Sequence, residues 1–298
     1  MTLRPGVHNV MATPFLPDET LDVDSIHSLV GYCASAGCEG VLILGVLGEA
    51  DRLSDAERET VIRAAVDAAR GQLQVTVGIT HQSTVVTRQR ALEAVEAGAT
   101  AVMVSPPIGS AAGPALHDHF ARIAENLPIP VVVQDHPTSS GVNMPVDFIV
   151  GLVGVLPPGG VVKLEAPPTA PKTATLLSKT DAFTVLGGLG GVSLMQELEA
   201  GSIGTMTGFA LPDILVRIVS SYRRGDVEAA YRAFEEALPV IVFEAQPGVG
   251  VGLRKELLRR RGAIAHATVR QPAPVANSTL LASLETLLQR LEMRAAVS

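Results

Sequence analysis

The stretch "IPVVVQDHPTSSG", residues 129–141, decides the fold because it joins a buried strand directly to a polar loop. The three valines at 131–133 are β-branched and apolar, and the run lacks the alternation of a strand with one wet face. Such runs are typical of parallel strands that are covered on both sides. The polar residues at 134–136 follow at the carboxyl end of this strand, which is the end that carries ligand sites in parallel α/β folds.

The rest of the chain repeats this pattern, with short apolar runs separated by longer amphipathic segments. The other seven strand candidates are "NVMATP" (9–14), "GVLILG" (40–45), "LQVTVGI" (73–79), "TAVMVS" (100–105), "GVVKL" (160–164), "FTVLGG" (183–188) and "GTMTG" (204–208). The helical candidates that follow them are residues 22–36, 54–70, 84–97, 115–126, 145–154, 169–179, 192–200 and 211–223. Eight strand–helix units predict an α/β fold, a closed (β/α)8 TIM barrel, with a doubly wound sheet as the alternative. No G-x-G-x-x-G run opens a first helix, which argues against a dinucleotide-binding fold.

The pattern changes near residue 225, after which no strand is expected. We therefore divide the chain into a catalytic barrel over residues 1–224 and a C-terminal helical segment over residues 225–298. Asp226 is expected to cap the first helix of this segment. The helices are expected over residues 226–245, 250–262 and 276–294, with the proline-containing connector "HATVRQPAPVANST" (266–279) inside the segment.

The composition fits a globular protein with a large core. Of 298 residues, 47% are hydrophobic and 18% are charged, so extended disorder is not expected. The net charge is −7 and no basic stripe occurs, which argues against a nucleic-acid partner. The start of the chain lacks the apolar run of a signal peptide, and no apolar stretch is long enough to span a membrane. We expect a cytoplasmic protein with no membrane partner, in which Cys33 and Cys38 are reduced core thiols.

Polar side chains gather where the predicted strands end, which is the active-site face of a TIM barrel. They are Glu49, Thr80, His81, Ser105, Gln134, Asp135, His136, Lys163 and Thr207. Lys163 is the most distinctive, because it lies inside the apolar stretch "GGVVKLEAPP" (159–168). An apolar barrel disfavours the ammonium form, and the free amine can attack a ketone to form a Schiff base. The alternative is a lysine at a strand end that extends its ammonium group to solvent.

His81, His136 and Glu49 are the titratable groups best suited to acid–base work. Each histidine also has a structural interpretation, as a loop side chain with one hydrogen bond. Glu49 precedes a turn and has the alternative of capping the next helix, although Ser54 with Glu57 already forms a capping box there. A metal site built from His81, His136 and Glu49 would lack the close sequence spacing that metal ligands usually show. We expect neither a metal ion nor a cofactor.

Four motifs carry a resemblance that spans residues 5–290. They are "VMATPF" (10–15), "GVLGEADRLSDAER" (45–58), "DHFARIAENLPIPVVVQDHPTSSG" (118–141) and "GVVKLEAPP" (160–168). In these motifs the chain resembles the dihydrodipicolinate synthase and N-acetylneuraminate lyase family, Schiff-base aldolases and dehydratases that act on pyruvate or other 2-keto acids. The resemblance implies a barrel with a three-helix C-terminal segment, assembly as a homotetramer, and Lys163 as the Schiff-base lysine.

The chain departs from this family at several site positions. The family turn Gly-Thr-Thr-Gly-Glu, whose threonines hold the carboxylate of the keto acid, reads Gly-Val-Leu-Gly-Glu at 45–49. Pro107 and Ile108 stand in place of a second tyrosine, Gln134 in place of the proton-relaying tyrosine, and Ser139 in place of an arginine that some synthases use. An amide cannot titrate and can only hold a hydroxyl by hydrogen bonds. These departures argue against dihydrodipicolinate synthase itself and weaken the case for a neuraminate lyase.

Three other stretches, "THQST" (80–84), "VVQDHP" (132–137) and "TMTGFALPD" (205–213), are similar to 2-keto-3-deoxy sugar-acid dehydratases, in particular those acting on 2-keto-3-deoxyarabonate. We therefore predict a lyase that dehydrates a 2-keto-3-deoxy sugar acid through an iminium at Lys163. The other predicted catalytic residues are Gln134, which orients the substrate, and His81 and Glu49, which move protons. The predicted substrate contacts are Val46, Leu47, Gly48, Ser105, His136, Ser139, Met206 and Thr207.

Two alternatives stay open from the sequence. One is a pyruvate-dependent aldolase of the same family with a less polar aldehyde, which the apolar Val46, Leu47 and Ile108 near the predicted site would suit. The other is a barrel that binds a keto acid without turning it over, since two threonines and a tyrosine are missing. In all three cases the expected partner is a small-molecule 2-keto acid.

Overall fold

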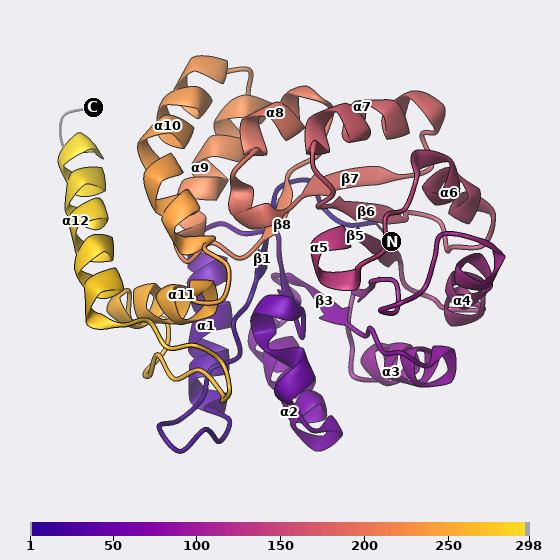
Figure 1. Ribbon diagram of the computed structural model, residues 1–298, viewed down its shortest axis with the longest axis horizontal. Helices are drawn as coiled ribbons and strands as arrows, with labels where there is room; N and C mark the ends of the chain where they lie inside the picture. Colours follow the sequence, from indigo (N-terminus) through magenta and orange to yellow (C-terminus); the bar gives the residue numbers. More distant parts are fainter. Residues whose placement is uncertain (1, 296–298) are drawn as a thin grey trace.

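The computed structural model describes residues 2–295. Met1, in the predicted barrel, and residues 296–298, in the predicted C-terminal segment, lie outside the described residues. Its centre is a closed barrel of eight parallel strands (Figure 1). The strands are β1 (Val7–Val10), β2 (Gly40–Ile43), β3 (Gln74–Gly78), β4 (Ala101–Val104), β5 (Val131–Asp135), β6 (Val161–Leu164), β7 (Thr184–Gly187) and β8 (Thr205–Thr207). Each strand pairs with the next, and β8 pairs with β1. The predicted TIM barrel is confirmed, and the doubly wound alternative is wrong.

The first strand is where the prediction and the structure differ most. β1 begins at Val7 and ends at Val10, whereas the sequence predicts a strand over 9–14. The strand includes His8, which has no exposed surface and whose Nε2 lies 2.8 Å from the carbonyl oxygen of Arg4. Burial lowers the pKa of His8 to about 4, so a neutral imidazole sits inside the barrel wall. Because His8 interrupts the apolar pattern, the sequence does not indicate that the strand begins at Val7.

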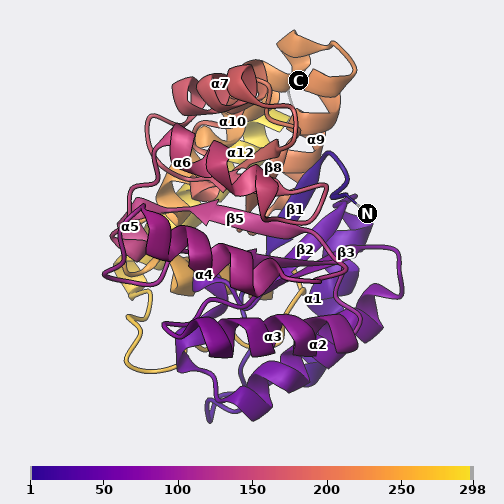
Figure 2. The same cartoon turned by 90° about the vertical axis from the view of Figure 1, so that its right-hand side faces the viewer.

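Helices follow the strands and form the outer layer of the barrel (Figures 1 and 2). They are α1 (Val23–Ser35), α2 (Asp55–Ala69), α3 (Thr84–Glu96), α4 (Pro114–Ala124), α5 (Pro137–Ser140), α6 (Val146–Gly151), α7 (Thr169–Lys179), α8 (Leu194–Glu199) and α9 (Pro212–Arg223). The capping box at the start of α2 is confirmed, because the Ser54 amide donates to Glu57 at 2.9 Å and the Glu57 amide donates to Ser54 Oγ. The short α5 was not predicted, since four residues carry no helical periodicity.

Three further helices follow the barrel, α10 (Val227–Glu244), α11 (Gly250–Arg260) and α12 (Ser278–Ala295) (Figure 1). The side chain of Asp226 accepts a hydrogen bond from the Ala229 amide and begins α10, as predicted. α10 packs along α9, so the helical segment continues the outer layer of the barrel. Between residues 2 and 295, none of the helices combines the length and the apolar character that a membrane crossing requires.

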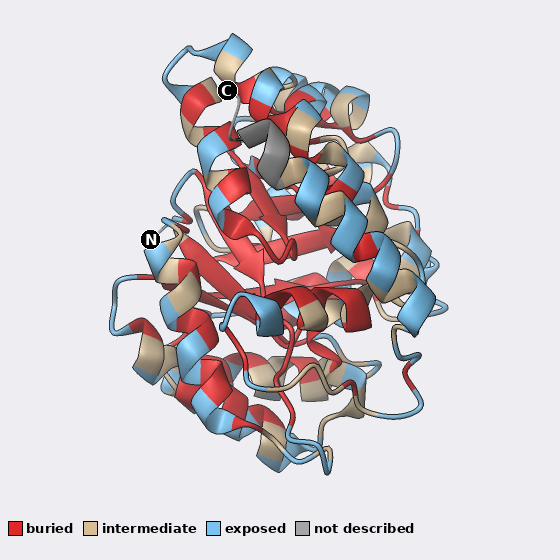
Figure 3. Ribbon diagram, turned by 90° about the vertical axis from the view of Figure 1, so that its left-hand side faces the viewer, coloured by how far each residue is buried: buried red, intermediate tan, exposed pale blue. Residues whose placement is uncertain are grey.

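The buried side chains form two clusters, which lie on the strands and on the inward faces of the helices (Figure 3). The larger one fills the layer between strands and helices. The smaller one fills the inside of the barrel and consists of Leu3, Val10, Leu42, Ala101, Met103, Val132, Val161, Leu186 and Met206. Met206, predicted as a substrate contact, therefore packs in the inner core, where it has no exposed surface.

Candidate active site

Lys163 and Gln134 stand side by side at the carboxyl ends of β6 and β5. They are register partners in the parallel strand pair, so their side chains point to the same face of the sheet, the barrel interior. Their exposed fractions are 4% and 3%. The lysine thus lies inside the barrel and does not extend to solvent, which removes the alternative of an exposed strand-end lysine.

Glu165 completes a cluster that the sequence analysis missed. Its Oε2 lies 3.1 Å from Lys163 Nζ and accepts a 2.7 Å hydrogen bond from Gln134 Nε2, while its Oε1 accepts a bond from the Leu189 amide at 3.2 Å. Burial raises the pKa of Glu165, but the charge of Lys163 and these hydrogen bonds outweigh burial and leave the pKa below its usual value. Strand alternation could have indicated Glu165, because residues two positions apart in a strand face the same side and Glu165 follows Lys163 by two.

A cavity of about 580 Å³ borders this cluster, and we call it the lysine cavity. Lys163, Glu165 and Gln134 line it together with His136 and Thr207, two predicted substrate contacts. Burial lowers the pKa of His136, and its Nδ1 has no hydrogen-bond partner among the described residues. The unpartnered ring nitrogen of a neutral imidazole can donate or accept a hydrogen bond, depending on the tautomer, and so can bind a ligand in this cavity.

A second cavity of about 600 Å³ holds other residues of the predicted site, and we call it the histidine cavity. His81, Ser105 and Ser139 line it. Gln134 and Val46 line both cavities, so the two adjoin at these side chains.

His81 borders the histidine cavity and not the lysine cavity. Its Nδ1 accepts a 3.0 Å hydrogen bond from the Ser83 amide, which places the proton of the neutral ring on Nε2. His81 and Lys163 therefore border different cavities, which share Gln134 and Val46 in their linings. The carboxylate of Glu165 and the imidazole of His136 take the positions next to the lysine instead.

Glu49 borders neither cavity, which corrects its predicted acid–base role. It has no exposed surface, and its Oε1 lies 2.5 Å from Lys255 Nζ. Its Oε2 accepts a 2.9 Å hydrogen bond from the Arg270 amide and lies 3.3 Å from Arg52. A carboxylate held by three donors is a structural ion-pair partner. Nor does any group of three or more His, Cys, Asp or Glu side chains in residues 2–291, whose side chains are described, form a metal site.

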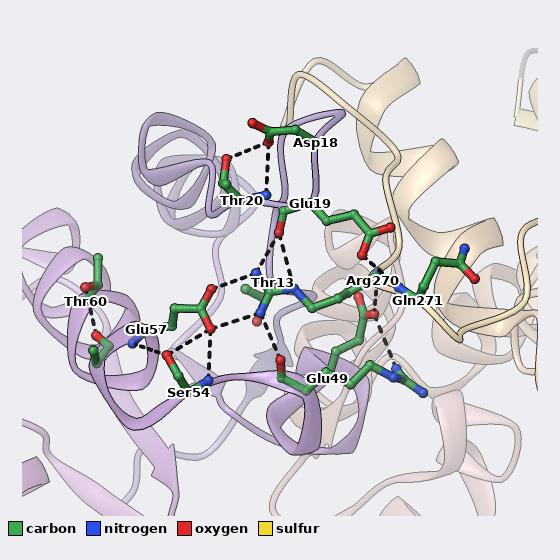
Figure 4. Close-up of polar contacts among 12 residues, drawn as sticks. Thr13, Asp18, Glu19, Thr20, Glu49, Ser54, Glu57, Thr60, Arg270 and Gln271 are labelled. Carbon is green, nitrogen blue, oxygen red and sulfur yellow. Dashed lines mark hydrogen bonds and ion pairs between the residues drawn. The ribbon is translucent and has the colours of Figure 1, made fainter.

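Arg270 connects this cluster to the loops that follow β1 and β2 (Figure 4). Its guanidinium donates to the carboxylate of Glu57 at 2.7 and 3.0 Å and to the carbonyl oxygen of Glu19 at 2.6 Å. The neighbouring residues 273–274 line the histidine cavity. The connector between α11 and α12 is thereby fixed as one wall of the site.

The turn after β2 presents apolar side chains to the site. Val46 and Leu47 line the lysine cavity. Both backbone polar groups of Gly48, predicted as a substrate contact, are already hydrogen-bonded within the protein. Its N–H donates to the Gly45 carbonyl at 3.0 Å, and its carbonyl accepts from Thr13 at 2.6 Å. This turn therefore offers no side-chain donor to a carboxylate.

The C-terminal helices add residues that the sequence analysis did not anticipate. Val242 and Gln246, near the end of α10, line the lysine cavity together with Arg254 of α11. Arg254 Nε lies 2.6 Å from Glu244 Oε1, and both side chains are buried. None of these residues follows a strand, so the rule that places active sites at strand ends cannot find them.

Comparisons with known proteins agree with this fold. The dihydrodipicolinate synthetase family model matches residues 4–291. The L-2-keto-3-deoxyarabonate dehydratase of Azospirillum brasilense is 30% identical over 294 residues, which cover 96% of this chain and 94% of that protein. The 4-hydroxy-tetrahydrodipicolinate synthase of Xanthomonas campestris pv. campestris is 33% identical over 299 residues, covering 95% and 98%. The dihydrodipicolinate synthase structure from Rhodopseudomonas palustris has a TM-score of 0.92 at 32% identity, covering 97% and 99%.

The fold and these matches together define a TIM-barrel enzyme of the lyase class. The chain belongs to the dihydrodipicolinate synthetase family, which confirms the resemblance seen in its motifs. Because the relatives include both a dehydratase and synthases, membership of the family leaves the substrate to be argued from the site.

Proposed function

We propose that this protein is a class I lyase that dehydrates a 2-keto-3-deoxy sugar acid through a Schiff base at Lys163. The observation that carries the proposal is the cluster of Lys163, Glu165 and Gln134 beside the lysine cavity. It combines an amine, a carboxylate within proton-transfer distance, and an amide where the family has a phenol. The similarity to the A. brasilense dehydratase supports the same class of substrate.

Glu165 supplies the proton transfers that Schiff-base formation needs. Transfer of a proton from the Lys163 ammonium to the carboxylate, across 3.1 Å, leaves a free amine that attacks the C2 carbonyl. The carbinolamine hydroxyl then takes that proton back and leaves as water. The products of this step are the iminium and an ionised Glu165.

The same carboxylate serves the dehydration. It removes a proton from C3, and the electron pair of the broken C–H bond forms an enamine with the iminium. The enamine then expels the C4 hydroxyl, which takes the proton from Glu165 and leaves as water. Gln134 donates to Glu165 through Nε2, so its Oε1 is available to hold the C4 hydroxyl.

A pyruvate-dependent aldolase is the second candidate, and the apolar lining favours it. Val46 and Leu47 line the lysine cavity, and Ile108 lines the histidine cavity. In this reaction a base takes the proton of the C4 hydroxyl and the C3–C4 bond breaks, which leaves pyruvate on the lysine. An apolar aldehyde would pack against these side chains, whereas a polyol acid needs more hydroxyl contacts.

The test combines trapping with a substrate screen. Borohydride reduction in the presence of pyruvate or a 2-keto-3-deoxy acid should add the acid's mass less one oxygen to wild type at Lys163, because the imine loses water and the reduction adds two hydrogens, and should add nothing to Lys163→Ala. Incubation with 2-keto-3-deoxy pentonates and hexonates should then consume one acid without release of pyruvate. Release of pyruvate would instead identify the aldolase. An adduct without turnover of any acid supports a barrel that only binds keto acids, and no adduct contradicts the class I mechanism.

We further propose that the chain acts in the cytoplasm as a homotetramer, as the family resemblance implies. Val85 and Leu92, which lie seven residues apart on α3, expose 66% and 42% of their surface, and such apolar side chains on one helix face are suited to a subunit interface. Light scattering on the purified protein should give four times the chain mass. A monomer would contradict this part of the proposal.

A further inference from the structure

Arg254 is a buried cation of the lysine cavity that the mechanism above does not use. It lies on α11, in the C-terminal helical segment, and 4% of its surface is exposed. It lines the same cavity as Lys163 and Glu165. Arginine is rarely buried unless it is paired, so its partners define what it can do.

The guanidinium of Arg254 is only partly satisfied. Its Nε donates to Glu244 Oε1 at 2.6 Å, and the other oxygen of Glu244 accepts from the Ala210 amide at 3.0 Å. The contact is therefore a single-point ion pair, not the two-pronged pairing that a guanidinium and a carboxylate can form. Nη1 is buried and has no hydrogen-bond partner among residues 2–291. A buried donor without a partner is unfavourable, which indicates that a ligand supplies the acceptor.

The unpartnered Nη1 lies at the end of β8, beside the turn that follows β2. A Cβ atom at Gly208 would come within 2.9 Å of Nη1 and within 2.7 Å of Leu47 Cδ1. Gly208 thus leaves the space through which the guanidinium reaches the strand end. Leu47 belongs to the turn whose counterpart in the family holds the keto acid's carboxylate through threonines.

The charge balance of the cavity favours an anion at this point. Lys163 is paired with Glu165 and Arg254 with Glu244, so the two buried pairs leave no net charge. The carboxylate of an entering 2-keto acid would be uncompensated unless a donor with free N–H groups meets it. With no hydroxyl at positions 46 and 47, Arg254 is the cation of this cavity with donors to spare.

We propose that Arg254 binds the carboxylate of the 2-keto acid whose carbonyl carbon Lys163 attacks. A guanidinium from the C-terminal helices thereby does the work of the two threonine hydroxyls that the β2 turn lacks. Arg254 holds C1, Lys163 reaches C2, and the rest of the chain extends past Gln134. The assignment rests on the proposed Schiff base for the position of C2, but the carboxylate contact can be tested separately.

The experiment compares a charged and a neutral ligand on wild type, Arg254→Gln and Arg254→Lys. Borohydride trapping is titrated with pyruvate and with pyruvamide, which carries no carboxylate. Loss of a charge-assisted contact should raise the half-saturating pyruvate concentration of Arg254→Gln about 10- to 100-fold. The pyruvamide value should change less than about 3-fold, and Arg254→Lys should fall between wild type and Arg254→Gln for pyruvate. Arg259→Gln, which removes an exposed arginine of α11 that lines neither cavity, is the matched control and should leave both titrations as in wild type.

The outcomes separate this inference from the proposed function. If pyruvate and pyruvamide titrations shift equally in Arg254→Gln, or neither shifts, Arg254 does not bind the carboxylate. If wild type forms no adduct, the Schiff base is wrong, and thermal-shift titration with pyruvate then tests the carboxylate contact alone. Because Arg254→Gln leaves Glu244 buried, Glu244→Gln/Arg254→Gln provides a second variant without the buried charge, with the same loss expected for pyruvate.

Discussion

Gln134 Nε2 and Lys163 Nζ meet the same oxygen of Glu165, at 2.7 and 3.1 Å. An amide donor and an ammonium on one oxygen both favour the charged carboxylate. When the lysine gives up its proton, one of these two stabilising contacts is lost, and the affinity of Glu165 for a proton rises. The carboxylate is thus coupled to the state of the lysine, and the first predictions follow from this coupling.

Glu165→Gln should lower turnover about 10²- to 10⁴-fold, because the variant lacks the carboxylate that accepts the C3 proton in the proposed mechanism. The measurement is deuterium uptake at C3 of pyruvate, followed by NMR, which does not require the natural substrate. Glu199→Gln, an exposed carboxylate on α8, is the control and should exchange at the wild-type rate. Exchange by Glu165→Gln at the wild-type rate would assign the base to another residue.

Gln134→Glu should shift the pH dependence upward. Two carboxyl groups would then share the 2.7 Å contact, and like charges at that distance raise the pKa of the pair. The acidic limb of the exchange rate should move to higher pH by about one unit or more. Gln134→Met, which has similar length and no charge, should slow exchange without this shift. An unchanged acidic limb in Gln134→Glu would show that Glu165 does not limit the rate there.

Glu197 should make the protein less stable as pH rises. Burial raises the pKa of this carboxyl to about 7 in the folded chain, whereas its ordinary value is 4.5. A group whose folded pKa is raised contributes stability below pH 4.5 that is lost as pH rises to 7, about 3 kcal/mol in total. Urea unfolding at pH 5 and pH 8 should show this loss in wild type and a smaller one in Glu197→Gln. Glu199→Gln should behave as wild type, and an equal loss in both variants would assign the effect elsewhere.

Glu49→Gln should destabilise the fold, since it leaves Lys255 buried without its ion-pair partner. Breaking one side of a buried pair lowers the free energy of unfolding by about 3–5 kcal/mol. Lys255→Met should do the same, and Glu49→Gln/Lys255→Met should lose less than the sum of the two. If Glu49→Gln keeps wild-type stability and loses deuterium exchange instead, the acid–base role predicted from the sequence holds after all.

The barrel was predictable because its strands are uninterrupted apolar runs, and the parallel sheet needs such runs to be covered on both faces. Lys163 and Gln134 were predictable for the same reason, since each ends or interrupts such a run. Glu165 follows the same alternation two residues after Lys163. It lies just outside the predicted strand 160–164, so the apolar pattern does not include it. Local periodicity is therefore enough to predict the cluster of Lys163, Gln134 and Glu165.

What the sequence could not reveal depends on contacts between distant segments. The position of Glu49 after a strand predicts that it lies at the active-site face, whereas its partners Lys255 and Arg270 lie more than 200 positions away. Arg254 belongs to an amphipathic helix whose pattern is the same whether it faces a core or a cavity. Only the position of Arg254 beside Gly208, at the end of β8, shows that this side chain faces a cavity.

The anchoring of Arg270 to Glu19 and Glu57 has a consequence for how the enzyme is made (Figure 4). A growing chain can complete all eight strands while α11 and the connector are still inside the ribosome. At that stage the early loops lack their guanidinium partner, and the lysine cavity lacks Arg254. Lys163 and the barrel core are thus synthesised before Arg254 and Arg270, so the proposed carboxylate contact can form only after α11 has emerged.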